Sequence, residues 1–204
     1  MSDIGAQDVM KLRKETGAGM MDAKRALQEA GGDFDDAKDL LRVKGLADAK
    51  KRAGRATNQG SIGHYLHYQT ERPVVGCLVE LLCETDFVAK SEEFQGTAKD
   101  LAMHLAARRP GWVRRDDVPG EVMAKEQQLF QAQAEEEGKP PEVAEKIIAG
   151  RLEAYLKDNV LYEQTFVNPE KFVGTVQEML DQLTLRLGEN VSVGKIARIS
   201  VGEE

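Results

Sequence analysis

The side chains that could carry out chemistry are few in this sequence and stand apart from one another. His64 and His67 are three residues apart in a segment that alternates as a β-strand does, so they point to opposite faces and cannot share a metal ion. Cys77 and Cys83 stand on the apolar face of the next predicted strand, where they serve as small hydrophobic residues. The acidic residues have spacings typical of solvated helix faces. We therefore predict no metal site, no cofactor and no catalytic residues.

Motifs for nucleotide and phosphate binding are absent or incomplete. The sequence contains neither a G-x-x-x-x-G-K-[ST] loop nor a G-x-S-x-G nucleophile elbow. Residues 17–19, GAG, match the start of a dinucleotide-binding fingerprint, but Asp22 stands at the third glycine position and no strand precedes it. Residues 46–58 are rich in Ala, Lys and Arg, which favours an exposed helix or linker and leaves a phosphate-binding patch open. These observations favour a function in binding rather than in bond chemistry.

One short stretch, residues 84–90, fits neither of the regular patterns around it. The residues before it alternate as in a strand, and after Ser91 a helical stripe begins at Phe94. Ser91 is the predicted N-cap of that helix, because two glutamates follow it in the first turn. Phe87 belongs to neither apolar pattern. Either Thr85 or Asp86 caps a single turn that returns Phe87 to the core, or Phe87 is exposed and contacts a partner.

The composition excludes several classes of protein. The chain has 204 residues, 41% of them hydrophobic, and can bury a core without disulfides or metals. Its formal net charge of −7 argues against binding nucleic acid through a broad basic face. Two cysteines without a framework favour a reducing compartment, and we find neither an export signal nor a membrane-spanning apolar run. We expect a cytoplasmic protein that binds neither membranes nor nucleic acid directly.

Residues 1–45 are predicted to form three short amphipathic helices that end at glycines. Asp33 is the predicted N-cap of the third helix, and Gly45 its end. Such a minimal bundle is similar to ubiquitin-associated domains, which have little core and bind other molecules. Adjacent residues on a helix point about 100° apart, so Met20 and Met21 are hard to bury together in so small a bundle. We place a basic linker or helix at residues 46–58.

Residues 59–204 are predicted to form an α+β core in which helices cover a three-stranded antiparallel sheet. The predicted strands are residues 62–68, 73–83 and 191–201, and the predicted helices are residues 92–108, 121–137, 141–157 and 169–187, with residues 160–167 extended. The buried face of the second strand carries alternate apolar residues: Val75, Cys77, Val79, Leu81 and Cys83. The last strand is predicted to present one apolar face: Val191, Val193, Ala197, Ile199 and Val201.

Two motifs together resemble the elongation factor Ts family. They are LRKETGAGMMD at residues 12–22 and ETDFVAK at residues 84–90, in this order and with a basic linker and a strand pair between them. The similarity continues through KDLAMH at residues 99–104 and GKP at residues 138–140 to the last strand. The length is similar to that of the short, single-core members of the family.

The resemblance implies a guanine nucleotide exchange factor for elongation factor Tu. It implies that Leu12, Met20 and Met21 dock the N-terminal bundle onto the nucleotide-binding domain of that partner. It also implies that Thr85, Asp86, Phe87 and Val88 approach the nucleotide and disturb the partner's Mg²⁺ coordination, with the aromatic ring as a wedge. Of the two interpretations of Phe87, the resemblance favours the exposed ring, and we predict that Phe87 is exposed.

Two further expectations concern assembly, and two alternative functions stay open. We expect a homodimer through the core domain, because two single cores would restore the surface of a duplicated core. The dimer should be non-covalent, since the last strand carries Ala197 and no cysteine. The alternative functions are a regulatory adapter that binds peptides or ubiquitin-like partners through the bundle, and an RNA- or ribosome-associated factor supported only by the basic residues 50–55.

Overall fold

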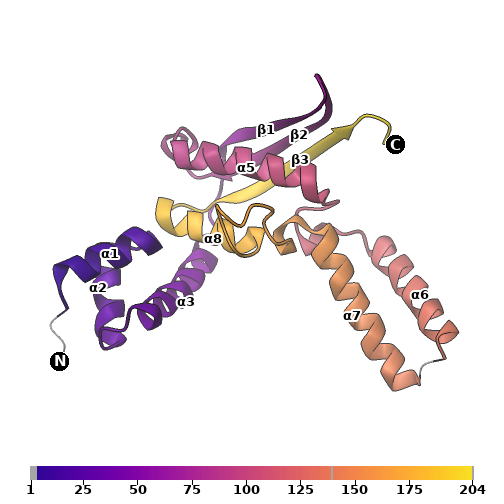
Figure 1. The fold of residues 1–204 in the computed structure, drawn as a ribbon, viewed down its shortest axis with the longest axis horizontal. Helices are drawn as coiled ribbons and strands as arrows, with labels where there is room; N and C mark the ends of the chain where they lie inside the picture. Colours follow the sequence, from indigo (N-terminus) through magenta and orange to yellow (C-terminus); the bar gives the residue numbers. More distant parts are fainter. Residues whose placement is uncertain (1–3, 139, 204) are drawn as a thin grey trace. The chain divides into compact units, whose positions relative to one another are not determined.

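The computed structural model describes residues 4–138 and 140–203, apart from the side chains of Leu46 and Lys50. The chain forms two compact units. The first combines Met1–Ser61, Leu81–Phe94 and Glu178–Ser192, and the second combines Ile62–Glu80, Gln95–Gln177 and Val193–Glu204. The predicted α+β class is confirmed, with helices and one three-stranded sheet in the order β1-β2-β3 (Figure 1). No helix in the described part of the chain is long and apolar enough to cross a membrane.

Three helices form the N-terminal bundle, as predicted: α1 (Ala6–Thr16), α2 (Met20–Glu29) and α3 (Phe34–Arg52). Gly17 ends α1 in the left-handed conformation that glycine adopts readily, with φ of 70°. Asp33 caps α3 as predicted, because its Oδ1 accepts hydrogen bonds from the backbone N–H groups of Asp35 and Asp36, both at 2.9 Å. The bundle core consists of buried aliphatic residues on the inner helix faces: Val9, Leu12, Ala23, Ala26, Leu27, Ala37 and Leu41.

The prediction that α3 ends at Gly45 is wrong, because the helix continues to Arg52. The absence of a side chain at Gly45 lets α3 pack closely against α8 (Val176–Leu187) within the first unit. A Cβ atom at Gly45 would lie only 2.3 Å from Leu185 Cδ1. Such a long-range contact leaves no local signal, and a glycine in a helix interior is then indistinguishable from a helix end.

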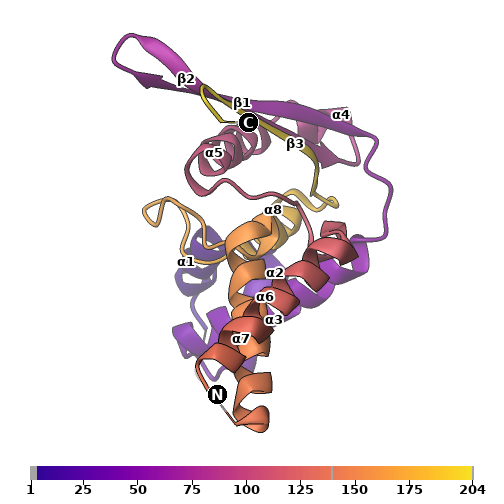
Figure 2. The ribbon, with the colours of Figure 1, turned by 90° about the vertical axis from the view of Figure 1, so that its right-hand side faces the viewer.

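The sheet consists of β1 (Gln59–Gln69), β2 (Arg72–Cys83) and β3 (Ser192–Ser200), with β2 in the centre. Strand β2 leads into the single-turn helix α4 (Asp86–Ala89) and then into α5 (Glu92–Arg108), which begins and ends as predicted. Helix α5 runs along one face of the sheet (Figure 2). At Gly63 the two elements are so close that a Cβ atom would lie 1.9 Å from the carbonyl oxygen of Ala98. The predicted inward residues Cys77 and Val79 are buried.

The predicted apolar face of the last strand is buried only at its beginning. Val191 and Val193 are buried, but Ala197 is exposed, and Ile199 and Val201 are 77% and 68% exposed. The apolar face is thus covered at its beginning and open to solvent from Ala197 onward. Alternation shows which residues share a face of a strand, but not whether another layer covers that face along its whole length.

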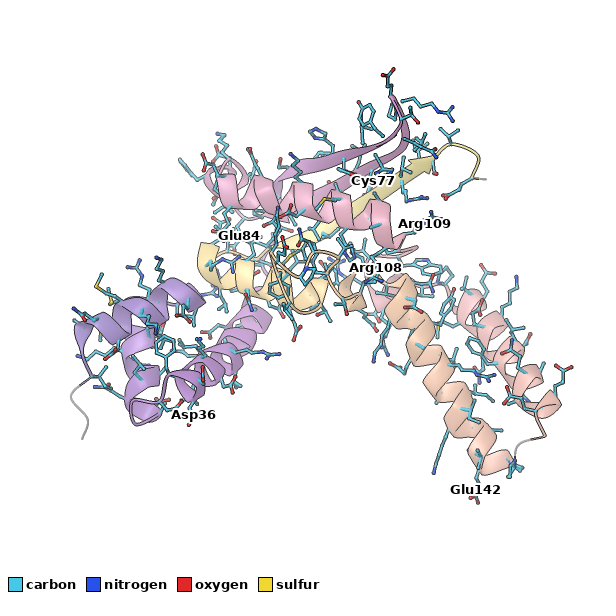
Figure 3. All side chains as sticks on the ribbon, viewed as in Figure 1. Asp36, Cys77, Glu84, Arg108, Arg109 and Glu142 are labelled. Atoms are coloured by element: carbon cyan, nitrogen blue, oxygen red, sulfur yellow. The ribbon has the colours of Figure 1, made fainter. Side chains whose placement is uncertain are left out.

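Helices α6 (Gly120–Glu136) and α7 (Pro141–Asn159) lie side by side as a hairpin, with Glu142 near its tip (Figures 1 and 3). At the other end Arg115, in a 3₁₀ turn (Arg115–Asp117), donates two hydrogen bonds to Glu153 and two to Glu163, at 2.7–2.9 Å. Such bidentate pairs are the strong form of surface ion pair. They join the base of the hairpin to the 3₁₀ turn Leu161–Glu163.

Two predictions for residues 160–175 are wrong. Residues 160–167 are not a regular strand, because a 3₁₀ turn occupies Leu161–Glu163. The following helix begins at Val176 rather than at residue 169. Asn168 Oδ1 accepts a hydrogen bond from the N–H of Glu170 at 3.1 Å, so it forms a local turn instead of capping a helix. Gly174, with φ of 145°, then takes the backbone out of the helical region.

Candidate functional site

The 84–90 segment is a single helical turn held between two caps. Thr85 is extended and its Oγ1 accepts a hydrogen bond from the N–H of Val88 at 3.4 Å, which caps the start of α4. At the other end the Oγ of Ser91 donates to the carbonyl oxygen of Val88 at 2.8 Å, and the N–H of Phe94 approaches the same Oγ at 3.4 Å. Ser91 therefore ends one helix and caps the next.

The ring of Phe87 points away from the body of the protein. Its side chain is 82% exposed, while Ala89 in the same turn is buried and Val88 is half-buried. The turn is thus anchored by small and branched apolar residues, and its largest apolar residue is left in solvent. The prediction of an exposed Phe87 is confirmed, and the interpretation in which it returns to the core is wrong.

Asp86 is paired with Lys90, one turn later on the same side of the helix. Lys90 Nζ lies 2.6 Å from Asp86 Oδ2, and both side chains are at least half exposed. The hydrogen bond from Lys90 lowers the pKa of the Asp86 carboxyl group below its ordinary value. Asp86 is therefore ionised at neutral pH, and a partner that binds its carboxylate must compete with Lys90.

A second contact, which the sequence analysis missed, holds the start of the segment. Glu189 lies in the turn between α8 and β3, and its carboxylate accepts hydrogen bonds from the backbone of Glu84 and from Thr85. Glu84 lies at the end of β2, beside α8 (Figure 3). More than 100 residues separate the partners in sequence, so no local pattern indicates the contact. In the sequence, Glu189 is marked only as an acidic residue that follows Gly188 at a predicted helix end.

The predicted docking residues of the bundle fall into two groups. Met20 and Met21 at the start of α2 are 43% and 67% exposed. Leu12 is fully buried in the bundle core and presents no surface to a partner. Two adjacent methionines cannot both face so small a core, which explains the exposure of this pair.

The described residues contain no cluster of His, Cys, Asp or Glu side chains suited to a metal ion. His64 and His67 are exposed, and the Nδ1 atom of His67 lies 3.3 Å from the hydroxyl of Tyr65. Cys77 and Cys83 are free and buried. The site presents two exposed apolar features: the aromatic ring of Phe87 on a capped turn, and the methionine pair Met20 and Met21.

Comparison with known proteins shows where these features belong. The family described as "Elongation factor TS" matches residues 49–203. The chain belongs to the elongation factor Ts family. It is 46% identical over 201 residues to elongation factor Ts of Fervidobacterium nodosum, covering 98% of this chain and 100% of that protein. It is 49% identical over 200 residues to elongation factor Ts of Moorella thermoacetica, covering 98% and 96% of the two chains.

Membership of the elongation factor Ts family extends through both units. The family match begins inside α3, but the relatives also align with the N-terminal bundle, because 98% of this chain is covered. A third relative, elongation factor Ts of Carboxydothermus hydrogenoformans, is 48% identical over 201 residues, which cover 98% of this chain and 90% of that protein. The alignments with these relatives thus cover the bundle, the sheet and the helical hairpin of this chain.

Proposed function

We propose that this chain is a guanine nucleotide exchange factor that binds elongation factor Tu in its GDP form and promotes release of GDP. The observation that carries the proposal is the ring of Phe87, which is 82% exposed on a turn that is capped at both ends. Aromatic residues are enriched at protein interfaces, and an aromatic anchor buried in a pocket of the partner can carry much of the binding energy. Membership of the elongation factor Ts family supports the choice of partner.

In the proposed mechanism, Phe87 inserts between side chains of the partner close to its nucleotide, and residues 85–88 disturb the partner's Mg²⁺ coordination. Mg²⁺ requires nearly ideal octahedral geometry, so a small displacement of a loop that carries one ligand weakens both metal and phosphate binding. No covalent bond forms or breaks, so the protein is not an enzyme and needs no acid or base. If it prefers the nucleotide-free partner, nucleotide weakens its binding by the same factor, and GTP then releases it.

The N-terminal bundle supplies a second docking surface in this proposal. Met20 and Met21 are exposed, and methionine is an adaptable contact residue. Leu12 contributes by supporting α1 from inside the bundle rather than by touching the partner. The bundle and the 84–90 segment belong to the same compact unit, which supports their binding one partner together. By function, we assign docking to residues 1–45, the connection to residues 46–58, which include the end of α3, and exchange and dimerisation to residues 59–204.

Release of fluorescently labelled GDP from purified elongation factor Tu tests the proposal. We expect the release rate to rise with the concentration of this protein and to reach a plateau. A Met20→Ser/Met21→Ser double variant should need a higher concentration to reach the same plateau, because it weakens docking and leaves the 84–90 segment intact. A release rate that stays at its spontaneous value in the presence of excess protein would contradict the proposal.

We also propose that the protein forms a homodimer through the sheet face opposite α5. Cys77 and Val79 are buried on one face of β2, whereas Leu78 between them points to the other face and is half exposed. On β1, Ile62 and Leu66 are also half exposed and have the opposite parity to Gly63, which faces α5. Together with Ile199 on β3 they form an apolar sheet face, of the kind that marks an interaction site.

The assembly is tested by light scattering at micromolar concentration, where a dimer has twice the 22.5 kDa mass of the chain. A Leu78→Lys variant should be monomeric and remain folded, because the residue it replaces is half exposed. The mass should not change on adding a reductant, since Cys77 and Cys83 are free and buried. A wild-type protein that scatters as a single chain would rule the homodimer out.

A cytoplasmic location completes the proposal. Burial raises the pKa of both the Cys77 and the Cys83 thiol, so the thiols stay protonated and unreactive. Free buried cysteines without disulfides are typical of proteins from a reducing compartment. The test is the fractionation of cells that produce the tagged protein, in which it should co-purify with other translation factors.

A further inference from the structure

The carboxylate of Glu189 gathers three hydrogen bonds from the start of the 84–90 segment. Its Oε2 accepts from the backbone N–H groups of Glu84 and Thr85, both at 3.0 Å. Its Oε1 accepts from the hydroxyl of Thr85 at 2.6 Å. Hydrogen bonds to an ionised acceptor are stronger than those between neutral groups. One side chain therefore fixes both the backbone and the side chain of Thr85.

The contact is reciprocal and includes the chain that follows α3. Oε1 of Glu84 accepts from the N–H of Asn190 at 2.7 Å and from Arg55 Nη1 at 3.4 Å. The hydrogen bond from Asn190 is the largest cause of a lowered pKa of the Glu84 carboxyl group. The side-chain amide of Asn190 donates in turn to the carbonyl oxygens of Arg55, at 2.8 Å, and Ala53, at 3.3 Å. The end of β2, the chain after α3 and the turn between α8 and β3 thus meet at the start of the segment.

The geometry points to Glu189 as the positioning residue that fixes the direction in which Phe87 is presented, a role that rests on the exchange function proposed above. A hydroxyl group has one proton and two lone pairs. Because the proton of Thr85 Oγ1 goes to Glu189, a lone pair is directed at the N–H of Val88 and caps α4. A four-residue helix has no stability of its own, since nucleation is costly and short helices are marginal. The direction of Phe87, the second residue of α4, therefore depends on the Thr85 cap and on Glu189.

Loss of Glu189 should affect the rate of GDP release but not the docking of the bundle onto the partner. The bundle residues Met20 and Met21 lie outside this hydrogen-bond network, so loss of Glu189 leaves that surface unchanged. Misplacing a group that acts at one point of a partner by about 1 Å is enough to reduce a rate by one to two orders of magnitude. Loss of Glu189 should therefore lower the maximal rate of GDP release and leave the concentration for half-maximal effect nearly unchanged.

The experiment measures GDP release from elongation factor Tu against the concentration of each full-length variant, with a thermal melt of each. We expect Glu189→Ala to lower the maximal rate by about tenfold and to change the half-saturating concentration by less than about threefold. Glu189→Gln should retain most of the rate, because its amide oxygen can accept both backbone N–H groups and its NH₂ can donate to Thr85 Oγ1. Glu142→Ala is the matched control, since Glu142 is an exposed carboxylate in the first turn of α7, outside the bundle and the 84–90 segment.

A double-variant comparison separates a positioning role from a merely structural one. If Glu189 acts through the segment, Glu189→Ala should have no further effect on the rate in a Phe87→Ala background. A full additional loss in that background, or a wild-type maximal rate for folded Glu189→Ala, would overturn the inference. If Glu189→Ala fails to fold, Thr85→Val and Thr85→Ser test the same contact, and only the serine variant should retain the rate. A Phe87→Ala protein with wild-type activity would instead refute the exchange mechanism itself.

Discussion

Moderate acidification should destabilise the second unit through a single buried histidine, His104. The side chain is fully buried, and its ring is stacked on Phe166 with 5.6 Å between centroids. Its Nδ1 accepts the N–H of Val167 at 3.1 Å, so the proton of the neutral ring must be on Nε2, which donates to Gln164 Oε1 at 2.9 Å. The amide group of Gln164 donates to the carbonyl oxygen of Asp158 at 2.6 Å, which fixes its orientation.

The direction of the effect follows from the pKa. Burial lowers the pKa of His104; the hydrogen bond to Gln164 opposes this shift, and the charge of Arg108 adds to it. The unfolded chain takes up a proton near pH 6.5, whereas the folded chain does not, so stability falls as the pH drops below about 6.5. The slope approaches about 1.4 kcal/mol per pH unit below the unfolded pKa, so the loss between pH 7.5 and 5.5 is at most about 1.4 kcal/mol.

Urea unfolding at a series of pH values, followed by the fluorescence of the single tryptophan, Trp112, measures this loss. His104→Asn keeps an acceptor near the N–H of Val167 but cannot titrate, so its stability should vary less between pH 7.5 and 5.5. His64→Asn is the matched control for the substitution itself, because His64 is exposed on β1 and the loss due to His104 should remain in this variant. Parallel stability curves for the wild type and His104→Asn would refute the reasoning.

The remaining predictions concern caps and close packing, and urea unfolding measures each of them. Asp33→Ala removes an acceptor of two backbone hydrogen bonds at the start of α3 and should cost about 1 kcal/mol, with no loss expected if the cap is unimportant. Gly63→Ala should cost at least about 3 kcal/mol, because the new Cβ would lie 1.9 Å from a backbone oxygen of α5. Gly96→Ala, in open space within α5, should instead stabilise by about 0.5–1 kcal/mol. Equal effects of the two glycine variants would contradict the packing argument.

Local features of the fold could be predicted from the sequence because their causes are local. The cap at Asp33, the start of α5 after Ser91 and the left-handed Gly17 each depend on residues within one turn. The exposure of Phe87 was predicted only from the family resemblance, because the local residues fit both a buried and an exposed ring.

The features that could not be predicted depend on contacts between distant parts of the chain. Gly45 lies in the interior of α3, where Leu185 approaches it too closely for a side chain, and nothing near Gly45 in sequence shows this. Whether a second layer covers Ile199 on β3 depends on the arrangement of whole elements. The contact of Glu189 with Thr85 joins residues more than 100 positions apart. No local sequence pattern could therefore predict this hydrogen-bonded support of the 84–90 segment.

The most direct test of the exchange mechanism is GDP release from elongation factor Tu by a Phe87→Ala variant whose thermal melt is recorded in parallel. Because the ring is 82% exposed, its removal should change the free energy of unfolding by no more than about 0.5 kcal/mol. Loss of an aromatic contact worth about 2–4 kcal/mol should lower the rate by a factor of roughly 30 to 1,000. A variant that melts far below the wild type, yet releases GDP at the wild-type rate while folded, would contradict the account.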